Sequence, residues 1–489
     1  MPPRPSPRPA LLVLLALPLL AASVAAPARA EPDLRWRGYL LGDIRFYTDD
    51  ELTYERVETT ANAHLSARLD SHVSATADLS VVFTEAPTPS SFADLGLRSE
   101  LDPWRVESDA LYVDFYDLGV DGLDLRVGRQ QLIWGSADRF HPVSNLNPLD
   151  LEDPTRFGRV IANEMVTLAL RPDWEAGGDG DDGPWLDEVA LQIVFVPFFK
   201  PARLPRSAEL AFVDEDVFAE RANTPLTHDL VAKQEVLERD SGWTFTNIPR
   251  VVLPERTPAN SMFGARLSGR LLDVDMGISY FRGFDDIPRA EKIVADTSGI
   301  PHVDTDVVLS YPRVQVLGFD AATSLGFLDG MGLWTEIGVT FHDDLRRVIS
   351  TGPAIGIDAV ETEDGAGAFV KAVVGADYTP VEWLYLNVQY LHGFVDEFSA
   401  DDLGNYIVAG GDFKLAHDSV LIRFFNIFDL DDGSYVLFPQ LVVKPWVGGE
   451  LALGGFIYSS SFTGYDETRK FDSRAAGQSS VFLQARANL

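Results

Sequence analysis

Several segments of this sequence carry arginines at alternate positions among apolar residues. These arginines could pair with negatively charged groups. A guanidinium binds a carboxylate or a phosphate through two parallel hydrogen bonds, so arginines gathered on one wall could guide an anionic group. The alternative is structural, because carboxylates on neighbouring segments could neutralise the arginines by pairing across strands. The arginines are Arg35, Arg37, Arg45, Arg68 and Arg486, and the nearby carboxylates are Asp33, Asp43, Asp78 and Asp114.

Catalytic and metal-binding motifs are not recognisable in the sequence. The eight histidines show no HExxH or paired metal-ligand spacing. The acidic stretch "GGDGDDG" (177–183) departs from a calcium-binding loop at Gly183 and Ala190. His64 and Ser66 share one face of a segment, but no motif accompanies them. We therefore predict that the protein is not an enzyme and that it uses no cofactor or metal.

The first thirty residues have the pattern of a secretory signal peptide. Arg4 and Arg8 precede an apolar run over 10–26, and Ala28-Arg29-Ala30 is a cleavage signal of the small-x-small type. A membrane anchor is the alternative, which the shortness of the apolar run disfavours. We expect residues 1–30 to be removed and the mature chain to begin at Glu31.

The charge and the cysteine content exclude two classes of function. Without Arg4, Arg8 and Arg29, 37 of the 40 basic residues remain against 74 acidic ones, a net charge of −37. A nucleic-acid partner requires a basic surface, so no nucleic acid is expected. The chain has no cysteine, which excludes disulfides and thiol chemistry.

Strict alternation of apolar and polar residues recurs from the first segment after the leader to the last residue. "HVSATADLSVVF" (72–83), "FGARLSGRL" (263–271) and "WLYLNVQY" (383–390) are examples. Successive side chains of a strand point to opposite faces, so each segment predicts a strand between an apolar and a polar environment. No segment after the leader approaches the roughly 18 apolar residues of a spanning helix.

The links between these segments alternate between short and long. Short links such as 70–71, 119–122 and 272–273 alternate with long ones, the longest running over 198–259. Outer-membrane barrels have short periplasmic turns and long outer loops. We therefore predict an all-β, antiparallel transmembrane β-barrel of about 18 strands, with 16 as the alternative, forming a single domain over 31–489. A secreted soluble sandwich or solenoid is the alternative fold. Tryptophans expected at the periplasmic end are Trp174, Trp185, Trp383 and Trp446.

The stretch "LDLRVGRQQLIWGSADRFHP" (123–142) breaks the alternation at Gly128-Arg129. A lipid-facing arginine at mid-membrane costs about 2–4 kcal/mol. We predict a bulge at Gly128 that turns Arg129 inward beside Arg126, with Leu132 and Trp134 meeting lipid. The alternative is that Arg129 lies above the bilayer and snorkels.

The loop over 135–159 is predicted to fold into the barrel as a constriction. Its prolines and asparagines favour fixed turns. Its apolar side chains need a surface to pack on, and the barrel interior provides one. The basic side chains Arg139, His141 and Arg156 would then stand in the pore.

"LRVGRQQLIWGSADRF" (125–140), with its GRQxxxWG pattern, and the following "NPLD" (147–150) resemble the signature of a known protein family. It is a family of Gram-negative outer-membrane barrels of unassigned function, similar to alginate-export and basic-amino-acid-type specific porins. "YVLFPQLVVKPWVGGELALGGFIY" (435–458) resembles their late strand pair. The resemblance implies a bacterial outer-membrane location and a transport function.

We expect a pore that passes or exports a polar, anionic solute, with the basic wall and the loop over 135–159 setting selectivity. One alternative is a conduit for hydrophobic or lipid-like molecules that works with a periplasmic or inner-membrane partner. Another is a barrel scaffold for a partner protein. The expected partners are outer-membrane lipid, the solute, the barrel assembly machinery and a periplasmic transport partner.

Overall fold

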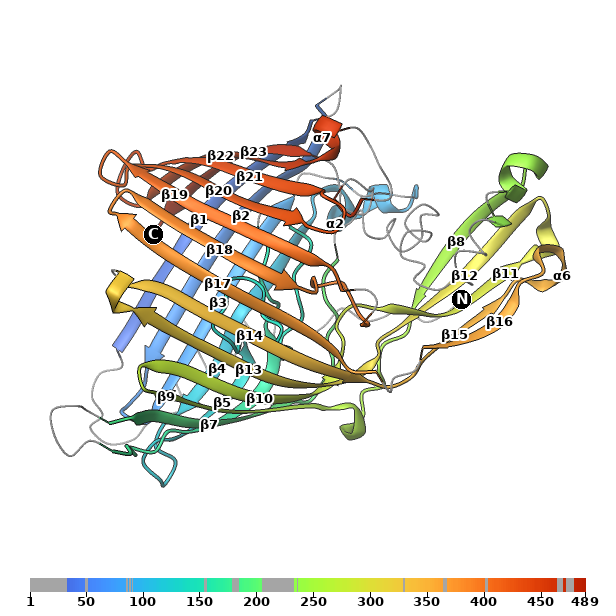
Figure 1. Ribbon diagram of the computed structural model, residues 1–489. Helices are drawn as coiled ribbons and strands as arrows, with labels where there is room; N and C mark the ends of the chain where they lie inside the picture. The colour runs from blue at the N-terminus through green and yellow to red at the C-terminus, as the bar shows by residue number, and fades with distance from the viewer. Residues whose placement is uncertain are drawn as a thin grey trace.

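The computed structural model of the chain is built almost entirely from β-strands arranged in one closed ring and one smaller sheet (Figure 1). The described residues are 33–48, 52–84, 87, 89, 91–153, 156–177, 184–204, 233–234, 236–328, 330–363, 367–400, 403–463, 469–471 and 479–489. The predicted signal peptide lies outside them.

The ring is an 18-stranded antiparallel sheet that closes when its last strand pairs with its first, Asn488 lying opposite Tyr39. The predicted barrel and its strand number are confirmed. The strands are β1 (Asp33–Tyr47), β2 (Tyr54–Arg68), β3 (Val73–Thr84), β4 (Trp104–Phe115), β5 (Leu123–Gln130), β6 (Asn163–Leu170), β7 (Leu186–Val196), β9 (Met262–Leu271), β10 (Val274–Phe284), β13 (Arg313–Leu325), β14 (Met331–His342), β17 (Phe369–Val381), β18 (Leu384–His392), β19 (Asn405–Leu415), β20 (Val420–Asp429), β21 (Tyr435–Val443), β22 (Gly449–Tyr458) and β23 (Ser480–Asn488).

The two faces of the ring differ as the alternation predicts. In β6, Asn163, Met165 and Thr167 are buried toward the inside, whereas Val166 and Leu168 are exposed on the outside. Large apolar side chains are exposed on the outer face of many other strands. An apolar band of this kind requires apolar surroundings, because soluble monomers rarely expose contiguous apolar surface of such extent.

The two ends of the barrel differ in the length of their connections (Figure 1). At one end, hairpins such as β9–β10 and β19–β20 are joined by a few residues, and the chain enters β1 and leaves β23 there. We call it the short-turn end. Trp174, Trp185, Trp383 and Trp446 lie at this end, and each is at least half exposed.

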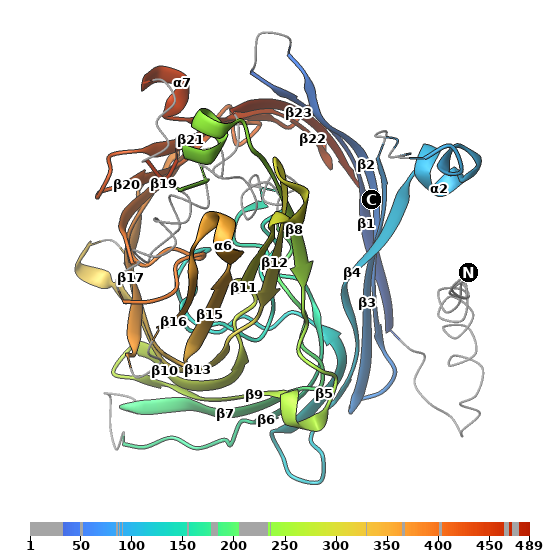
Figure 2. The ribbon, with the colours of Figure 1, turned by 90° about the vertical axis from the view of Figure 1, so that its right-hand side faces the viewer.

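The long connections at the other end contribute a second, five-stranded sheet that the sequence did not reveal. Its order is β16-β15-β11-β12-β8, and it projects beyond the barrel and stands in front of its opening (Figure 2). Two of its pairings, β11 with β15 and β12 with β8, are parallel. These strands are β8 (Thr244–Val251), β11 (Arg289–Asp296), β12 (His302–Ser310), β15 (Leu345–Ser350) and β16 (Asp358–Glu363).

Helical segments are confined to short pieces of the connections. They include η1 (Asp94–Gly96), α2 (Arg98–Leu101), η3 (Pro258–Asn260), η4 (Thr297–Gly299), η5 (Gly326–Leu328), α6 (Gly352–Ile355) and α7 (Ser460–Thr463), and residues 236–241 are also helical. Within the described residues, none of the helices has both the length and the apolar character needed to cross a membrane.

The predicted bulge at Gly128 is wrong. The pairing of β5 with β4 and with β6 runs through Gly128 without a shift of register. Arg129 therefore stays on the outer face beside exposed Val127 and does not line the pore. Its guanidinium is paired instead, with Nη1 2.7 Å from Glu164 Oε1 and Nε donating to the carbonyl of Ser108 at 2.7 Å. The bulge was expected to remove the charge of Arg129 from the outer face. The carboxylate of Glu164, opposite it on β6, neutralises that charge instead.

Gly128 is required for a different reason, which predicts the effect of substituting it. Its φ is +132°, and a Cβ there would lie 2.4 Å from the carbonyl oxygen of Leu111. We expect Gly128→Ala to lower the free energy of unfolding by about 1–3 kcal/mol. Gly42→Ala is the control, because a Cβ at Gly42 meets nothing within 4 Å. Urea unfolding of the refolded barrel measures both, and equal midpoints would contradict the assignment.

Candidate functional site

The described part of the connection between β5 and β6, residues 131–153 and 156–162, lies inside the barrel and contacts strands around the ring. The indole N–H of Trp134 donates to Gln192 Oε1 of β7 at 2.6 Å, and the amide of Ala137 donates to Glu336 Oε1 of β14 at 2.6 Å. Trp134 is thus 1% exposed and packed in the lumen, which corrects the prediction that it meets lipid. Leu132 packs against the same buried cluster, so it does not meet lipid either. We call residues 131–162 the inward loop.

Glycines on the barrel wall make room for the inward loop. A Cβ at Gly264 would lie 2.7 Å from Trp134, and one at Gly318 would lie 2.9 Å from Val143. A Cβ at Gly338 would lie 2.7 Å from the carbonyl oxygen of Pro142. These glycines belong to β9, β13 and β14, so the wall is shaped to hold the loop at close range.

Apolar packing holds the middle of the inward loop against the opposite wall. Phe140 lies 4.9 Å from Phe157 and 5.5 Å from Phe394 between ring centroids. The same buried cluster continues over inward-facing aromatic side chains of neighbouring strands. They are Tyr406 of β19, Phe425 of β20, Phe438 of β21, Phe456 of β22 and Phe482 of β23.

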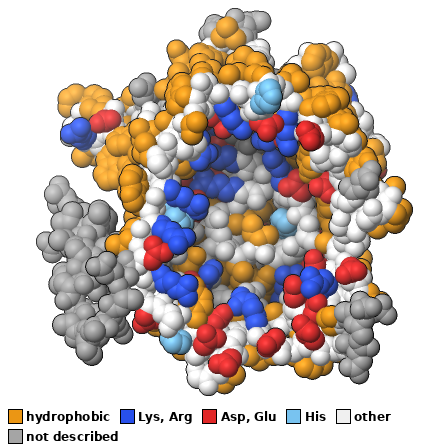
Figure 3. Space-filling model, turned by 90° about the vertical axis from the view of Figure 1, so that its left-hand side faces the viewer, with side chains coloured by type: hydrophobic (Ala, Val, Ile, Leu, Met, Phe, Trp, Pro, Cys, Tyr) orange, Lys and Arg blue, Asp and Glu red, His pale blue; other side chains and the backbone are white. Residues whose placement is uncertain are grey.

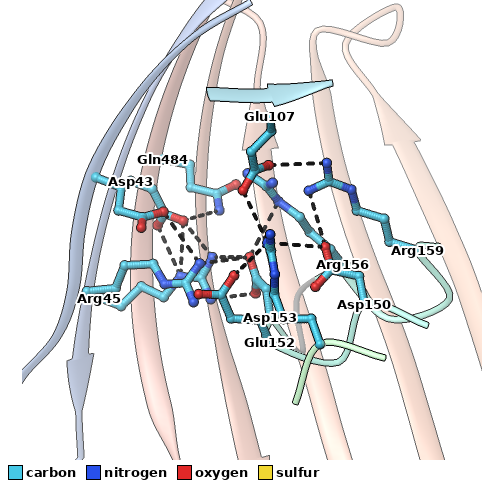
Figure 4. A network of polar contacts seen from close by, with 12 residues as sticks. Asp43, Arg45, Glu107, Asp150, Glu152, Asp153, Arg156, Arg159 and Gln484 are labelled. Atoms are coloured by element: carbon cyan, nitrogen blue, oxygen red, sulfur yellow. Dashed lines mark hydrogen bonds and ion pairs between the residues drawn. The ribbon is translucent and has the colours of Figure 1, made fainter. Parts of the chain in front are cut away.

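A buried ion-pair network holds the end of the inward loop against β1 (Figure 4). Arg45 is 1% exposed, and its Nη1 and Nη2 lie 2.6 and 2.8 Å from the two carboxylate oxygens of Asp153. The same guanidinium also pairs with Asp43. Burial by itself would raise the pKa of Asp153, but the hydrogen bonds and charge of Arg45, with Arg56 and Arg156, hold it below its ordinary value. Arg45 thus faces inward, as expected, but it is covered and neutralised.

The network extends to the next strands and loops. Arg159 Nη2 lies 3.1 Å from Asp109 Oδ1, and Arg203 Nη1 lies 3.1 Å from Glu107 Oε1. Both arginines also approach Asp150, at 3.6 and 3.8 Å. Burial nevertheless raises the pKa of Asp150. The inward loop is therefore tied through charges to β4 and to the connection after β7.

The predicted arginines nearest the short-turn end lie on β1, β2 and β23 but do not form one group, because Arg486 is paired eight positions further along β1 than Arg68. Arg68 is opposite Asp33, and Arg486 is opposite Leu41. Arg35 pairs with Asp33 at 2.8 Å, and both are exposed. Arg37 is exposed. Figure 3 views this end and shows a hollow with basic and acidic side chains around it.

Some of the remaining predicted arginines pair with carboxylates and one does not. Arg126 Nε lies 2.6 Å from Asp114 Oδ1, and Arg156 Nε lies 3.4 Å from Asp153 Oδ2. The structural alternative, pairing with carboxylates, thus describes Arg35, Arg45, Arg126, Arg129 and Arg156. Arg139 instead lies over the ring of Phe425, at 4.5 Å from its centroid.

Sequence reasoning missed a buried acidic pair on the wall beneath the inward loop. Asp320 of β13 and Glu336 of β14 lie opposite one another and are 3% and 0% exposed. Arg266 Nη2 donates to Asp320 at 2.6 Å, and His141 Nδ1 lies 3.0 Å from Glu336 Oε1. In the sequence, the only sign of this pair is that both residues stand at inward-facing positions of the alternating pattern.

The parts of the chain that the structure describes contain no group of three or more His, Cys, Asp or Glu side chains that could hold a metal ion. No protein-family model matches the chain, and no curated protein matches it.

Among solved structures, a mutant of the Rh. blastica porin matches over 94% of this chain and 100% of its own, at 9% identity and a TM-score of 0.39. Salmonella typhi OmpF in complex with daunomycin matches over 93% of this chain and 97% of its own, at 9% identity and a TM-score of 0.37. Likeness at this level carries no conclusion about function, and the barrel rests on its own strand pairing.

Breaking the contact between Asp153 and Arg45 should destabilise the barrel strongly. Asp153→Ala leaves a buried guanidinium without two of its hydrogen bonds, and such a loss costs about 3 kcal/mol. The control is Asp102→Ala, which breaks an exposed pair with Arg98 and should cost less than about 1 kcal/mol. Urea unfolding compares the two, and similar losses would rule out the buried pair as a main anchor of the loop.

A second anchor of the inward loop predicts a dependence of stability on pH. Asp286, in the connection after β10, accepts a hydrogen bond from the amide of Leu149 at 2.6 Å. Burial, with the charge of Asp285 next, raises the pKa of Asp286 to about 7 from its ordinary 3.8. The folded state therefore favours the protonated acid. The stability from this group is full below about pH 4 and is lost as the pH rises through about 7.

Asp286→Asn tests this, because the amide carries no charge at any pH. The free energy of unfolding of the variant relative to the unmodified protein should increase between pH 5 and pH 8. Unfolding titrations at several pH values measure the difference. A difference that does not change with pH would contradict the raised pKa.

Proposed function

We propose that this chain is an outer-membrane transport barrel whose lumen is narrowed by the inward loop. The observation that carries the proposal is the closed ring of 18 strands with an apolar outer face and an ionic inner face. A closed ring satisfies every backbone hydrogen bond within the sheet, which is the condition for crossing a bilayer with strands. A bacterial outer membrane is the expected location, with the short-turn end facing the periplasm.

Transport is favoured over catalysis because the buried charged side chains around the end of the inward loop form ion pairs that brace it. The buried Arg45 is fully engaged by Asp43 and Asp153. Such groups fix the shape of a passage, and among the described residues no recognisable pair of nucleophile and base accompanies them.

An anionic solute is favoured by the arginines whose charge is not neutralised by a close carboxylate. Among the described residues, no ion pair involves Arg37, Arg68 or Arg486 at the short-turn end. Arg68 donates to the carbonyl of Asp70, and Arg486 donates to Asn488 and lies over Tyr39. These groups place positive charge without a carboxylate partner on the wall formed by β1, β2 and β23, in a chain whose overall charge is −34. The positive potential of these arginines is strengthened between the low-dielectric walls of the barrel and would then attract anions.

A second candidate function is a conduit for hydrophobic or lipid-like molecules that works with a periplasmic or inner-membrane partner. Phe425, Phe438, Phe456 and Phe482 favour it, because these buried rings make one side of the inner wall apolar. Ion conduction separates the two, since an ion pore must conduct when open and a lipid conduit need not.

Conductance of the refolded protein in planar bilayers, with reversal potentials in a salt gradient, tests the pore. We expect an anion-selective conductance that becomes less selective when Arg37, Arg68 and Arg486 are replaced together by serine. The control replaces the outward-facing Arg282 by serine and should leave the selectivity unchanged. A cation-selective channel would overturn the anion preference. A folded barrel without conductance would favour the lipid conduit.

A further inference from the structure

Arg139 differs from the other arginines of the inward loop in having no anionic partner. Arg156 and Arg159 lie within 3.4 and 3.1 Å of carboxylate oxygens. Arg139 makes no hydrogen bond or ion pair with any residue that the structure describes, and its contact is the ring of Phe425. The guanidinium keeps its charge at every physiological pH. A half-buried cation in the lumen is thus left with its donors unused.

The backbone holds Arg139 in a conformation that a non-glycine residue rarely adopts. Its φ is +69°, in the left-handed region, which is unfavourable for a residue with a Cβ. Gly158 packs directly against it, since a Cβ there would lie 2.8 Å from the Cβ of Arg139. On either side, Ala137 is hydrogen-bonded to Glu336 and Phe140 is buried. The loop is therefore rigid at this point, and strained residues held by their surroundings cluster at binding sites.

The nearest charges do not neutralise Arg139. Asp412 lies opposite Arg423 on β19 and β20, and both of its oxygens accept from that arginine, at 2.8 and 2.9 Å. Burial lowers the pKa of Arg139, the charges of Asp138 and Asp412 raise it and that of Arg423 lowers it, and the balance lies below its ordinary value. An incoming anion would offset the effects of burial and of Arg423.

The surroundings of Arg139 also supply apolar surface. Phe425 belongs to the buried aromatic cluster, and Ala137 and Leu421 are partly buried against the same cluster. A ligand here meets one guanidinium and several apolar side chains. A fully hydrated inorganic anion uses only the first of these.

We propose that Arg139, stacked on Phe425, is a binding subsite for a small carboxylate with an apolar, ring-containing body. The carboxylate pairs with the guanidinium, and the body lies on the apolar surface beside it. The proposal rests on the proposed function, in which the lumen is the path of an anionic solute, and names the class of that solute.

Isothermal titration calorimetry of the detergent-solubilised protein with benzoate tests the subsite, with acetate and benzyl alcohol as comparison probes. We expect benzoate to bind more tightly than either. Arg139→Gln should weaken benzoate binding about tenfold or more, because it removes a charge-assisted pair. Arg282→Gln is the matched control: it removes the same charge from the outer face and should leave the affinity unchanged. Arg139→Lys should give an intermediate loss, since it keeps the charge without the bidentate geometry.

Heat-dependent electrophoretic mobility checks that each variant is folded. Unchanged benzoate affinity in Arg139→Gln, or no benzoate binding to the unmodified protein, would overturn the subsite. Acetate binding as tightly as benzoate would overturn the apolar body. Because calorimetry does not depend on conductance, a barrel that binds benzoate through Arg139 but carries no current would refute the ion pore and leave the subsite standing. A conducting barrel with unchanged affinity would do the reverse.

Discussion

The pairing of β23 with β1 turns an open sheet of 18 strands into a closed ring. It leaves no sheet edge in the ring and fixes which residues of all the strands face inward. It also completes the surroundings of Arg45, because Gln484 of β23 donates to Asp43 at 3.1 Å. The strand pair that closes the barrel therefore also supports the anchor of the inward loop.

Two kinds of interaction hold the inward loop, and they act at different places. Around Phe140 the loop is held by burial of aromatic surface, which is non-directional and sets only how closely the loop packs. Around Asp153 it is held by charge-assisted hydrogen bonds of fixed geometry, which set orientation. The buried pair adds little net stability compared with an apolar replacement, but leaving either partner alone is costly. The apolar contacts around Phe140 alone would allow several arrangements of the loop. The ion pairs around Asp153 select one of them.

The sequence predicted the barrel because a period of two is written into every strand, and neighbouring strands in the ring are also neighbours in the chain. The prediction failed at Arg129 because the charge of the side chain was given more weight than the strict alternation, which places this residue on the outer face. Its partner Glu164 lies on the next strand. The contact between Arg45 and Asp153 spans 108 positions, and nothing local signals it. Arg139 was placed in the lumen by the loop pattern, but its lack of a partner is a property of the folded structure alone.

The five-stranded sheet was missed for a related reason, and its construction has a consequence for how the protein folds. Its strands come from three separate connections, and its two parallel pairings cannot form within a single hairpin. The segments meet only after the barrel strands between β7 and β17 are in register. The barrel hairpins β9–β10 and β13–β14 lie in the chain between the segments that pair in parallel, so forming these hairpins first shortens the loops that the parallel pairs must close. The five-stranded sheet therefore forms late in folding, and it cannot serve as a template for the barrel.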